Sequence, residues 1–507
     1  MSPWEGIVSG LYVVMKPEIL VFCFFGVLIG TLVGVLPGLG PVGAIALLLP
    51  MTFGQDFIVA IIMLSGIYYG AMYGGSTTSI LINVPGEATS VATCIDGYQM
   101  ALKGRAGPAL AIAAIGSFIA GTIGIFFLMM VAPALARFAL RFGPPEYFAL
   151  AFLGLLTLSR LTGKSPLKSY TVMLLGMAIA TVGIDSVSGF ARFTGGSSAL
   201  LEGIDFIPVI MGLYGIGEVF ASVKKIGVSP RITLFRTRDL IPTRKDIKDS
   251  VGPILRGGLM GFFLGLIPGP SAIISTFGSY TLERKLSKRP EEFGKGAIEG
   301  VAGPEAANNG ASSGAFVPLL SLGIPFSPVP AVLLAAFMIH GILPGPLLIR
   351  DHPNIFWGLI ASMYVGNIML LVLNLPLVGI FARVALIPNR IIMPTIIAFC
   401  FIGAFAVRNS IYDLFLLLIF GIIGFFFRLQ DYDPAPLVLG MIIGPMLEEA
   451  FRESMVIFGG DVFQFFLRPL SGVMIGISIF VIISLFLSQF IKIFGIVFQR
   501  IDKRKAS

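Results

Sequence analysis

The sequence predicts an all-α polytopic membrane protein, and three observations lead to this fold class. Hydrophobic residues make up 56% of the 507 residues, and charged residues only 12%. The mean hydropathy is +0.93. Soluble domains carry about 25% charged residues, so a soluble protein of this length could not cover its surface with so few. Long stretches without charge recur along the chain, and they are continuously apolar instead of alternating as in an outer-membrane barrel.

The charge-free stretches predict the membrane passes. A helix needs about 20 residues to cross the hydrocarbon core, and several stretches exceed that length. Pro-Gly pairs interrupt them, so we expect roughly 10–14 helical passes, some broken or re-entrant. The longest stretches are 19–55, 57–86, 106–136, 257–282, 306–349, 353–382 and 469–491.

The chain also repeats itself. Leu36-Pro37-Gly38 has a counterpart in Ile267-Pro268-Gly269, and Gly75–Ser79 in Gly310–Gly314. Three further matches follow in the same order, which argues for a duplication. We therefore predict four parts: an N-terminal membrane repeat (1–220), a basic linker (221–256), a C-terminal membrane repeat (257–455), and a final transmembrane helix with a basic tail (456–507).

Charged loops predict the orientation of the repeats. The linker carries nine basic and three acidic residues, so the positive-inside rule places it in the cytoplasm together with the basic tail. The loop 281–295 of the second half has five basic residues, whereas the corresponding loop 51–57 of the first half has none. This exchange is expected of inverted-topology repeats. The segment 257–282 joins two basic loops on the same side, and a re-entrant hairpin with Pro268 and Gly269 at its tip would allow this. Pro37 and Gly38 would form the tip of a matching hairpin in the first half. Simple helix kinks at these residues are the alternative.

Two clusters of glycine, hydroxyl and amide residues form the candidate binding site. Glycine and proline interrupt the helical hydrogen bonds, and interrupted backbone inside a membrane must be buried or line a wet cavity. The free N–H groups of such a break attract carboxylates, and its carbonyl oxygens suit sodium. We expect substrate binding by Gly75, Ser76, Thr77, Thr78, Asn83, Pro85, Gly86, Asn308, Asn309, Ser312, Ser313 and Pro325, with a sodium ion near Asn83 and Asn309.

The two clusters and the acidic residues near them also have a simpler explanation. Small residues also mediate close helix packing in membranes. Four acidic residues lie near the clusters, and each either contacts an ion or substrate or merely caps a helix end in water. They are Glu87, Asp96, Glu299 and Glu305. No basic residue lies inside either cluster, and Lys103 or Arg105 could assist an anion only by folding inward.

Other function classes lack support in the sequence. There is no Walker-type loop, no Ser-His-Asp arrangement and no HExxH motif, so we do not expect an enzyme. The three cysteines and two histidines are scattered, which speaks against a resident cofactor or metal centre. The net charge of +8 fits cytoplasmic membrane loops and does not indicate nucleic-acid binding.

The Leu-Pro-Gly-Leu-Gly-Pro stretch, the Tyr-Gly-Gly-Ser-Thr-Thr-Ser block with Val-Pro-Gly-Glu, and the Asn-Asn-Gly-Ala-Ser-Ser-Gly block resemble the large membrane subunit of the tripartite tricarboxylate transporter family. The resemblance extends over about 18–455. It implies a sodium-coupled secondary symporter of the bacterial inner membrane that imports citrate-like tricarboxylates or other organic carboxylates. It also implies a fold similar to elevator-type carriers.

The resemblance further implies partners: a small membrane subunit and a periplasmic solute-binding protein, with the substrate chosen largely by the latter. Whether the chain forms a homodimer in the lipid bilayer stays open. Two alternatives remain, namely a carboxylate carrier that works without a binding protein, and a channel-like or structural membrane component in which the clusters only pack helices.

Overall fold

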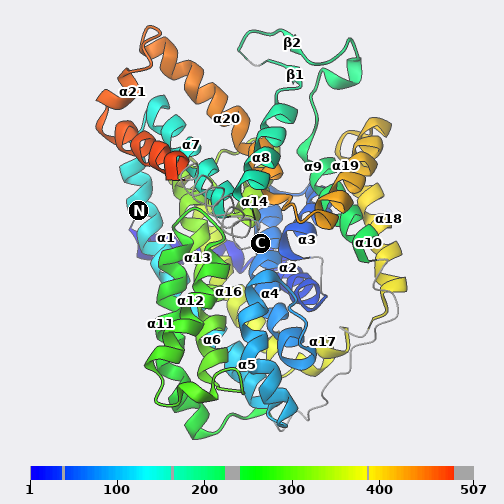
Figure 1. Ribbon diagram of the computed structural model, residues 1–507, viewed down its shortest axis with the longest axis vertical. Coiled ribbons are helices and arrows are strands. Elements are labelled where there is room, and N and C mark those ends of the chain that lie inside the picture. The colour runs from blue at the N-terminus through cyan, green and yellow to red at the C-terminus, as the bar shows by residue number, and fades with distance from the viewer. Residues whose placement is uncertain are drawn as a thin grey trace, which may run out of the picture. The chain divides into compact units, whose positions relative to one another are not determined.

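The computed structural model describes residues 2–36, 40–161, 165–185, 187–222, 240–384 and 387–484. Most of these residues fold into helices, which confirms the predicted all-α class (Figure 1). The two strands of the described part, β1 (Gly183–Ile184) and β2 (Ala191–Arg192), form a two-residue antiparallel ladder.

The described helices fall into two compact units. Unit 1 comprises residues 1–141 and 205–430, and unit 2 comprises 142–204 and 431–507. Each unit combines segments of both predicted repeats, and the predicted boundaries of the four parts remain a prediction. The helices of unit 1 are α1 (Pro3–Val14), α2 (Pro17–Val35), α3 (Gly40–Leu48), α4 (Phe57–Ile82), α5 (Val91–Leu102), α6 (Ala106–Ala139), α9 (Phe206–Ile210), α10 (Gly217–Ser222), α11 (Arg244–Gly265), α12 (Ser271–Leu286), α13 (Glu299–Leu322), α14 (Pro328–Ile339), α15 (Leu348–Asp351), α16 (Pro353–Asn374), α17 (Val378–Val384), α18 (Asn389–Arg408) and α19 (Ile411–Leu429). Those of unit 2 are α7 (Pro144–Leu161), α8 (Pro166–Ala180), α20 (Ala435–Ile457) and α21 (Gln464–Leu467).

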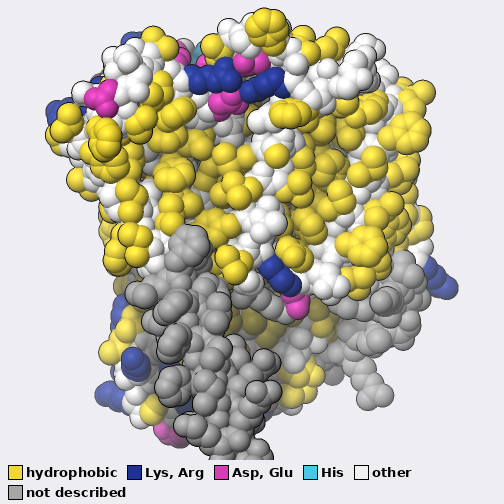
Figure 2. All heavy atoms as spheres, turned by 45° about the horizontal axis from the view of Figure 1, so that its top comes forward, with side chains coloured by type: hydrophobic (Ala, Val, Ile, Leu, Met, Phe, Trp, Pro, Cys, Tyr) yellow, Lys and Arg dark blue, Asp and Glu magenta, His cyan; other side chains and the backbone are white. Residues whose placement is uncertain are grey.

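Six helices of the described part are long and apolar enough to cross a membrane: α2, α4, α6, α16, α18 and α19. α11, α13 and α20 are similarly long but more polar, and further apolar helices are shorter. The total number of passes therefore remains a prediction. Figure 2 shows hydrophobic side chains over most of the face in view and a compact group of charged side chains near its upper edge. These features fit a multi-pass membrane protein.

Glycines let α2 and α4 approach to backbone contact. A Cβ atom added to Gly26, Gly30 or Gly34 of α2 would lie 2.3–2.6 Å from a carbonyl oxygen of α4. On α4, an added Cβ atom at Gly70 or Gly74 would lie 2.8 or 2.2 Å from a carbonyl oxygen of α2. Small residues spaced by one turn allow this kind of helix contact in membranes.

The same contact recurs between α11 and α13. Gly257, Gly261 and Gly265 of α11 occupy the positions of the α2 glycines, each against a carbonyl oxygen of α13. On α13, Gly310 and Gly314 correspond by their contacts to Gly70 and Gly74 of α4. The sequence comparison had paired Gly310 with Gly75, so the predicted alignment of the clusters is shifted by about one turn. The Val-Pro-Gly and Ile-Pro segments keep their predicted pairing, because each follows a left-handed residue that ends its helix, Asn83 or Gly323.

The equivalent helices α4 and α13 run antiparallel. Ser76 near the end of α4 contacts Glu305 near the start of α13, whereas Tyr68 and Phe316 meet further along with ring centroids 5.8 Å apart. Equivalent helices in opposite directions are what inverted repeats require. The inverted topology itself remains a prediction that these contacts support.

A helical hairpin forms at the predicted place in the second half. α11 and α12 pack together, and the intervening turn contains Pro268 and Gly269. The Gly269 N–H donates to the carbonyl oxygen of Phe326, 3.0 Å away, in the loop that follows α13. The hairpin reading is thus favoured over a kink here. In the first half, the predicted tip residues Pro37 and Gly38 lie outside the described residues, between α2 and α3.

Two groups of three helices each combine helices from both predicted halves, because the last helix of each half packs on two helices of the other half. In unit 1, the helix formed by α9, η4 (Met211–Ile216) and α10 packs on α18 and α19, with Gly212 against the Leu417 carbonyl. In unit 2, α20 packs on α7 and α8, with Gly440 against the Met173 carbonyl. Each group therefore takes two helices from one half and one helix from the other.

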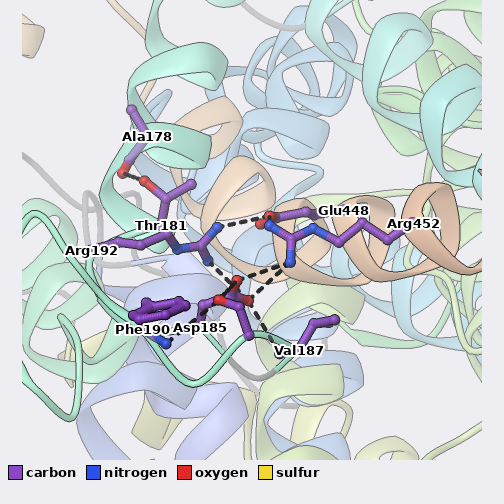
Figure 3. A network of polar contacts seen from close by, with 9 residues as sticks. Ala178, Thr181, Asp185, Val187, Phe190, Arg192, Glu448 and Arg452 are labelled. Carbon is purple, nitrogen blue, oxygen red and sulfur yellow. Dashed lines mark hydrogen bonds and ion pairs between the residues drawn. The ribbon is translucent and has the colours of Figure 1, made fainter.

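An ion-pair network in unit 2 fastens the loop that carries β1 and β2 to α20 (Figure 3). Asp185 accepts hydrogen bonds from Ser188 at 2.6 Å and from Arg452 at 2.9 Å. Glu448 contacts Arg192 at 2.7 Å and Arg452 at 2.6 Å. Hydrogen bonds from Ser188 and then Arg452 hold the pKa of Asp185 below its ordinary value of 3.8. Two arginines from different segments thus share two carboxylates.

Replacing Asp185 by asparagine should release this loop. Asparagine keeps the shape but loses the charge that attracts Arg452, so limited proteolysis should cut the loop faster than in the wild type. Because the pKa of Asp185 is lowered by folding, its anchoring is complete above the ordinary carboxyl pKa and is lost as the pH falls through the lowered value. Glu449→Gln, at an exposed position on α20, is the matched control and should leave cleavage unchanged. Equal cleavage rates for Asp185→Asn and the wild type would contradict the anchoring role.

Candidate functional site

Polar side chains meet in the interior of unit 1, where α4, α5, α6 and α13 pack together. Two carboxylates, Glu87 and Glu305, lie at the centre of this polar core, and both are buried. Their partners are hydroxyl and amide groups from neighbouring helices. The predicted clusters on α4 and α13 therefore do come together, as the sequence suggested.

Glu305 joins three helices. Ser76 of α4 donates to its Oε2 atom at 2.5 Å, and Thr93 of α5 donates to its Oε1 atom. Each carboxyl oxygen thus has one hydroxyl donor from a different helix. Glu305 itself lies in the second turn of α13 and is 1% exposed. Its position fixes α4 and α5 against α13.

Glu87 comes from the loop that follows α4. Asn83 ends α4 in the left-handed conformation, and the chain then turns through Pro85 and Gly86 to the short helix η2 (Ala88–Ser90). The turn brings Glu87 back against Gly75, where an added Cβ would lie 2.8 Å from its Cγ atom. Asn308 of α13 donates its Nδ2 to the Oε1 atom of Glu87 at 2.9 Å, and Thr89 donates to the same oxygen.

A second group of amides and hydroxyls continues the polar core toward α6 and α16. Asn309 donates its Nδ2 to Ser117 of α6 at 2.7 Å. Tyr73 of α4 donates to Asn367 of α16 at 2.5 Å. A narrow cavity between these helices has five polar residues in its lining: Tyr73, Ser76, Thr77, Ser117 and Asn374. The cavity volume is about 10 Å³, which is room for about one water molecule.

The predicted site residues differ in what they do. α4 and α13 are continuous through Gly75–Ser79 and Gly310–Gly314, so these clusters are not helix breaks; the breaks come later, at Asn83 and Gly323. The small residues of these clusters allow neighbouring helices to pack closely, and each helix continues through its cluster. The hydroxyls of Thr78, Ser312 and Ser313 bond to carbonyl oxygens of their own helix. Pro85, Gly86 and Pro325 lie in the loops after the breaks.

The four acidic residues separate into two kinds. Asp96 accepts from the backbone N–H groups of Gly296 and Ala297 and from Tyr280, so it fixes the loop before α13. Glu299 lies 3.8 Å from Arg289. Asp96 and Glu299 thus have structural partners, whereas Glu87 and Glu305 belong to the polar core. The sequence left these two possibilities open for all four.

The nearby basic residues stay outside the core. Arg105 pairs with Asp246 at 2.5 Å, and Lys103 donates to the Lys295 carbonyl at 2.5 Å.

Sequence reasoning missed Tyr73, Thr93, Ser117, Asn367 and Asn374, because single polar residues in long apolar helices carry no recognisable spacing. Among the described residues, no group of three or more His, Cys, Asp or Glu side chains is placed to hold a metal ion.

Unit 1 also contains a larger pocket of about 360 Å³, away from the polar core. Aliphatic side chains of α2, α3, α10 and α18 form nearly all of its walls, with Glu218, Ser222 and Thr395 as its polar residues. Such walls offer few donors to an organic anion. The polar core is therefore the better candidate site.

Comparison with known proteins identifies the family. The family model described as the tripartite tricarboxylate transporter TctA family matches residues 20–439. The chain belongs to this family. An uncharacterised 52.8 kDa protein of the TAR-I ttuC' 3' region of Agrobacterium vitis is 47% identical over 475 residues, which is 93% of this chain and 93% of that protein. A second Agrobacterium vitis protein, from the TAR-II ttuC' 3' region, is 44% identical over 44% of this chain and 92% of its own length. No solved structure matches the chain.

Membership of the TctA family confirms the resemblance drawn from the Pro-Gly and glycine-hydroxyl motifs. The matched region contains all of the polar core, from Thr31 of α2 to Asn374 of α16. The chain is thus a large subunit of the tripartite tricarboxylate transporter kind, and the polar core is the natural place to look for its transport site.

Proposed function

We propose that this chain is the permease subunit of a sodium-coupled secondary transporter that imports citrate-like tricarboxylates or other organic carboxylates across the bacterial inner membrane. A small membrane subunit and a periplasmic solute-binding protein complete the transporter in this proposal. Family membership supports it, and the observation that carries it is the buried polar core between α4 and α13. Polar groups inside a membrane protein are costly, so their gathering at one place marks a functional site.

The arrangement of the helices supports a carrier more than a channel. Equivalent helices run in opposite directions through the core, and the hairpin α11–α12 touches the loop after α13 through Gly269 and Phe326. Inverted repeats with binding at their interface are typical of secondary transporters that alternate access. An elevator-type movement is part of the proposal. The channel-like alternative predicts flux that does not saturate.

Uptake into reconstituted vesicles tests the proposal. The chain and its small partner are reconstituted, the binding protein is added outside, and labelled citrate and other carboxylates are offered with and without a sodium gradient. Saturable uptake that needs both sodium and the binding protein is the expected result. Uptake without the binding protein would favour the simpler carboxylate carrier, and non-saturating flux would favour the channel.

Ser76 and Ser313 should differ sharply on removal of their hydroxyl groups. Ser76→Ala removes a donor from the buried Glu305 carboxyl, and a hydrogen bond to a charged group contributes about 1.5–3 kcal/mol, or roughly tenfold to hundredfold in affinity. Ser313→Ala removes only a bond to the Asn309 carbonyl of its own helix, so its uptake should stay close to wild type. Sodium-dependent uptake of the two variants is the measurement. Equal effects in both would contradict the site drawn around Glu305.

A further inference from the structure

The two carboxylates of the polar core have no cationic partner. Glu87 is 9% exposed and Glu305 is 1% exposed. Within the described part of the chain, every hydrogen-bond donor to either carboxylate is a hydroxyl or an amide, and no Lys, Arg or His forms an ion pair with them. An uncompensated charge buried in a membrane protein is costly. A positive charge from outside the chain would remove that cost.

Asn308 shows where that charge would go. Its Nδ2 atom donates to Glu87, which fixes the orientation of the amide. The opposite atom, Oδ1, is buried and has no hydrogen-bond partner, although Asn308 is only 1% exposed. A buried oxygen without a donor needs a partner, and a water molecule or an ion can supply it. The known hydrogen bonds also fill only part of the four or so acceptor positions that a carboxylate such as Glu87 offers.

We propose that Glu87 and Asn308 bind a monovalent cation, which is the coupling sodium ion of the proposed transporter. This inference rests on the proposed function for the identity of the ion. One positive charge matches the one negative charge of Glu87, and the carboxylate and amide oxygens are ligands that hard cations prefer. The site lies at Asn308 and not at the sodium position expected near Asn83 and Asn309, because the buried amide oxygen without a hydrogen-bond partner belongs to Asn308.

The bound cation also explains how an anion could enter this core. A substrate carboxylate that approaches Glu87 and Glu305 meets like charges and is repelled. With a cation between Glu87 and Asn308, the repulsion falls and the cation offers an attractive partner. The cation therefore binds before the organic anion, and it needs neither substrate nor binding protein to do so.

Thermal unfolding of the purified full-length chain in detergent tests this site without transport. The melting temperature is measured at constant ionic strength while NaCl replaces choline chloride, and again with KCl. Wild type should gain stability in a saturable way with sodium. Glu87→Gln and Asn308→Leu should each weaken the apparent sodium affinity by about tenfold to a hundredfold. Asn308→Asp adds a second carboxylate, so it should melt lower without sodium and gain more than wild type with it.

Glu449→Gln is the control, because it removes the same charge at an exposed position and should leave the sodium response unchanged. If wild type shows no saturable sodium effect, or if Glu87→Gln and Asn308→Leu respond as wild type does, the cation site is wrong. Sodium-dependent uptake together with an unaffected Glu87→Gln would reject this site but keep the transporter. A Glu87-dependent sodium response without carboxylate uptake would keep the site but reject the proposed function.

Discussion

Glu305→Gln should reduce sodium-dependent uptake at least about a hundredfold while the protein still folds. Glutamine keeps the shape, but it carries no charge and its NH2 nitrogen accepts no hydrogen bond, so neither Ser76 nor Thr93 keeps a charge-assisted bond. Two charge-assisted hydrogen bonds contribute about 1.5–3 kcal/mol each, so their loss exceeds a factor of a hundred. Initial uptake rates in vesicles measure the effect, and the melting temperature verifies folding.

Two further variants sharpen this experiment. Glu305→Ala leaves two buried hydroxyls without their acceptor, so it should lower the melting temperature as well as uptake. Glu299→Gln removes a carboxylate from the first turn of the same helix, where Arg289 is its neighbour, and should keep uptake near the wild-type rate. Wild-type kinetics and sodium dependence in Glu305→Gln would show that Glu305 only holds helices together.

The second large effect is expected at Gly86, where substitution should damage folding itself. A Cβ atom at this position would lie 1.9 Å from the carbonyl oxygen of Gly34 and 2.7 Å from the Cα atom of Gly75. Both neighbours are backbone, so neither can turn aside. Gly86→Ala must push α2 away from the loop after α4, and we expect a loss of about 3 kcal/mol or more in stability.

The melting temperature and the yield of folded Gly86→Ala in detergent are the readouts. Gly379→Ala is the control, since Gly379 lies in α17 with nothing within 4 Å of an added Cβ. Alanine in an open helical position is neutral or slightly stabilising. A melting temperature for Gly86→Ala close to that of Gly379→Ala would mean that the loop can shift without cost, contrary to the close contact described here.

Much of this architecture could be predicted from the sequence, because composition and spacing reflect simple physical requirements. Low charge and long apolar stretches predicted membrane helices. Pro268 and Gly269 lie in the turn between α11 and α12, while their place at the tip of a re-entrant hairpin stays a prediction. The Val-Pro-Gly and Ile-Pro segments marked the real helix ends. The glycine-hydroxyl clusters were correctly placed in one core, but their glycines serve close helix contact and the helices continue through them.

What could not be predicted depends on contacts between distant segments. Glu87 and Glu305 looked no different from Asp96 and Glu299 along the chain, since each of the four could have capped a helix end. Only the fold shows that Glu87 turns back against Gly75 and Asn308 while Asp96 meets the backbone of Gly296. The unpartnered oxygen of Asn308 likewise has no signal in the sequence, because it depends on which way the amide points.

The exchange of the last helix between the two halves has a consequence for biosynthesis. α7 and α8 emerge from the ribosome long before α20, the helix that covers them, and α9 and α10 must wait for α18 and α19. Neither half can finish its own three-helix group, so each leaves helix surfaces open until the other has been inserted. The fused chain supplies both in one translation product, and two separately expressed halves should be recovered only when they are made together.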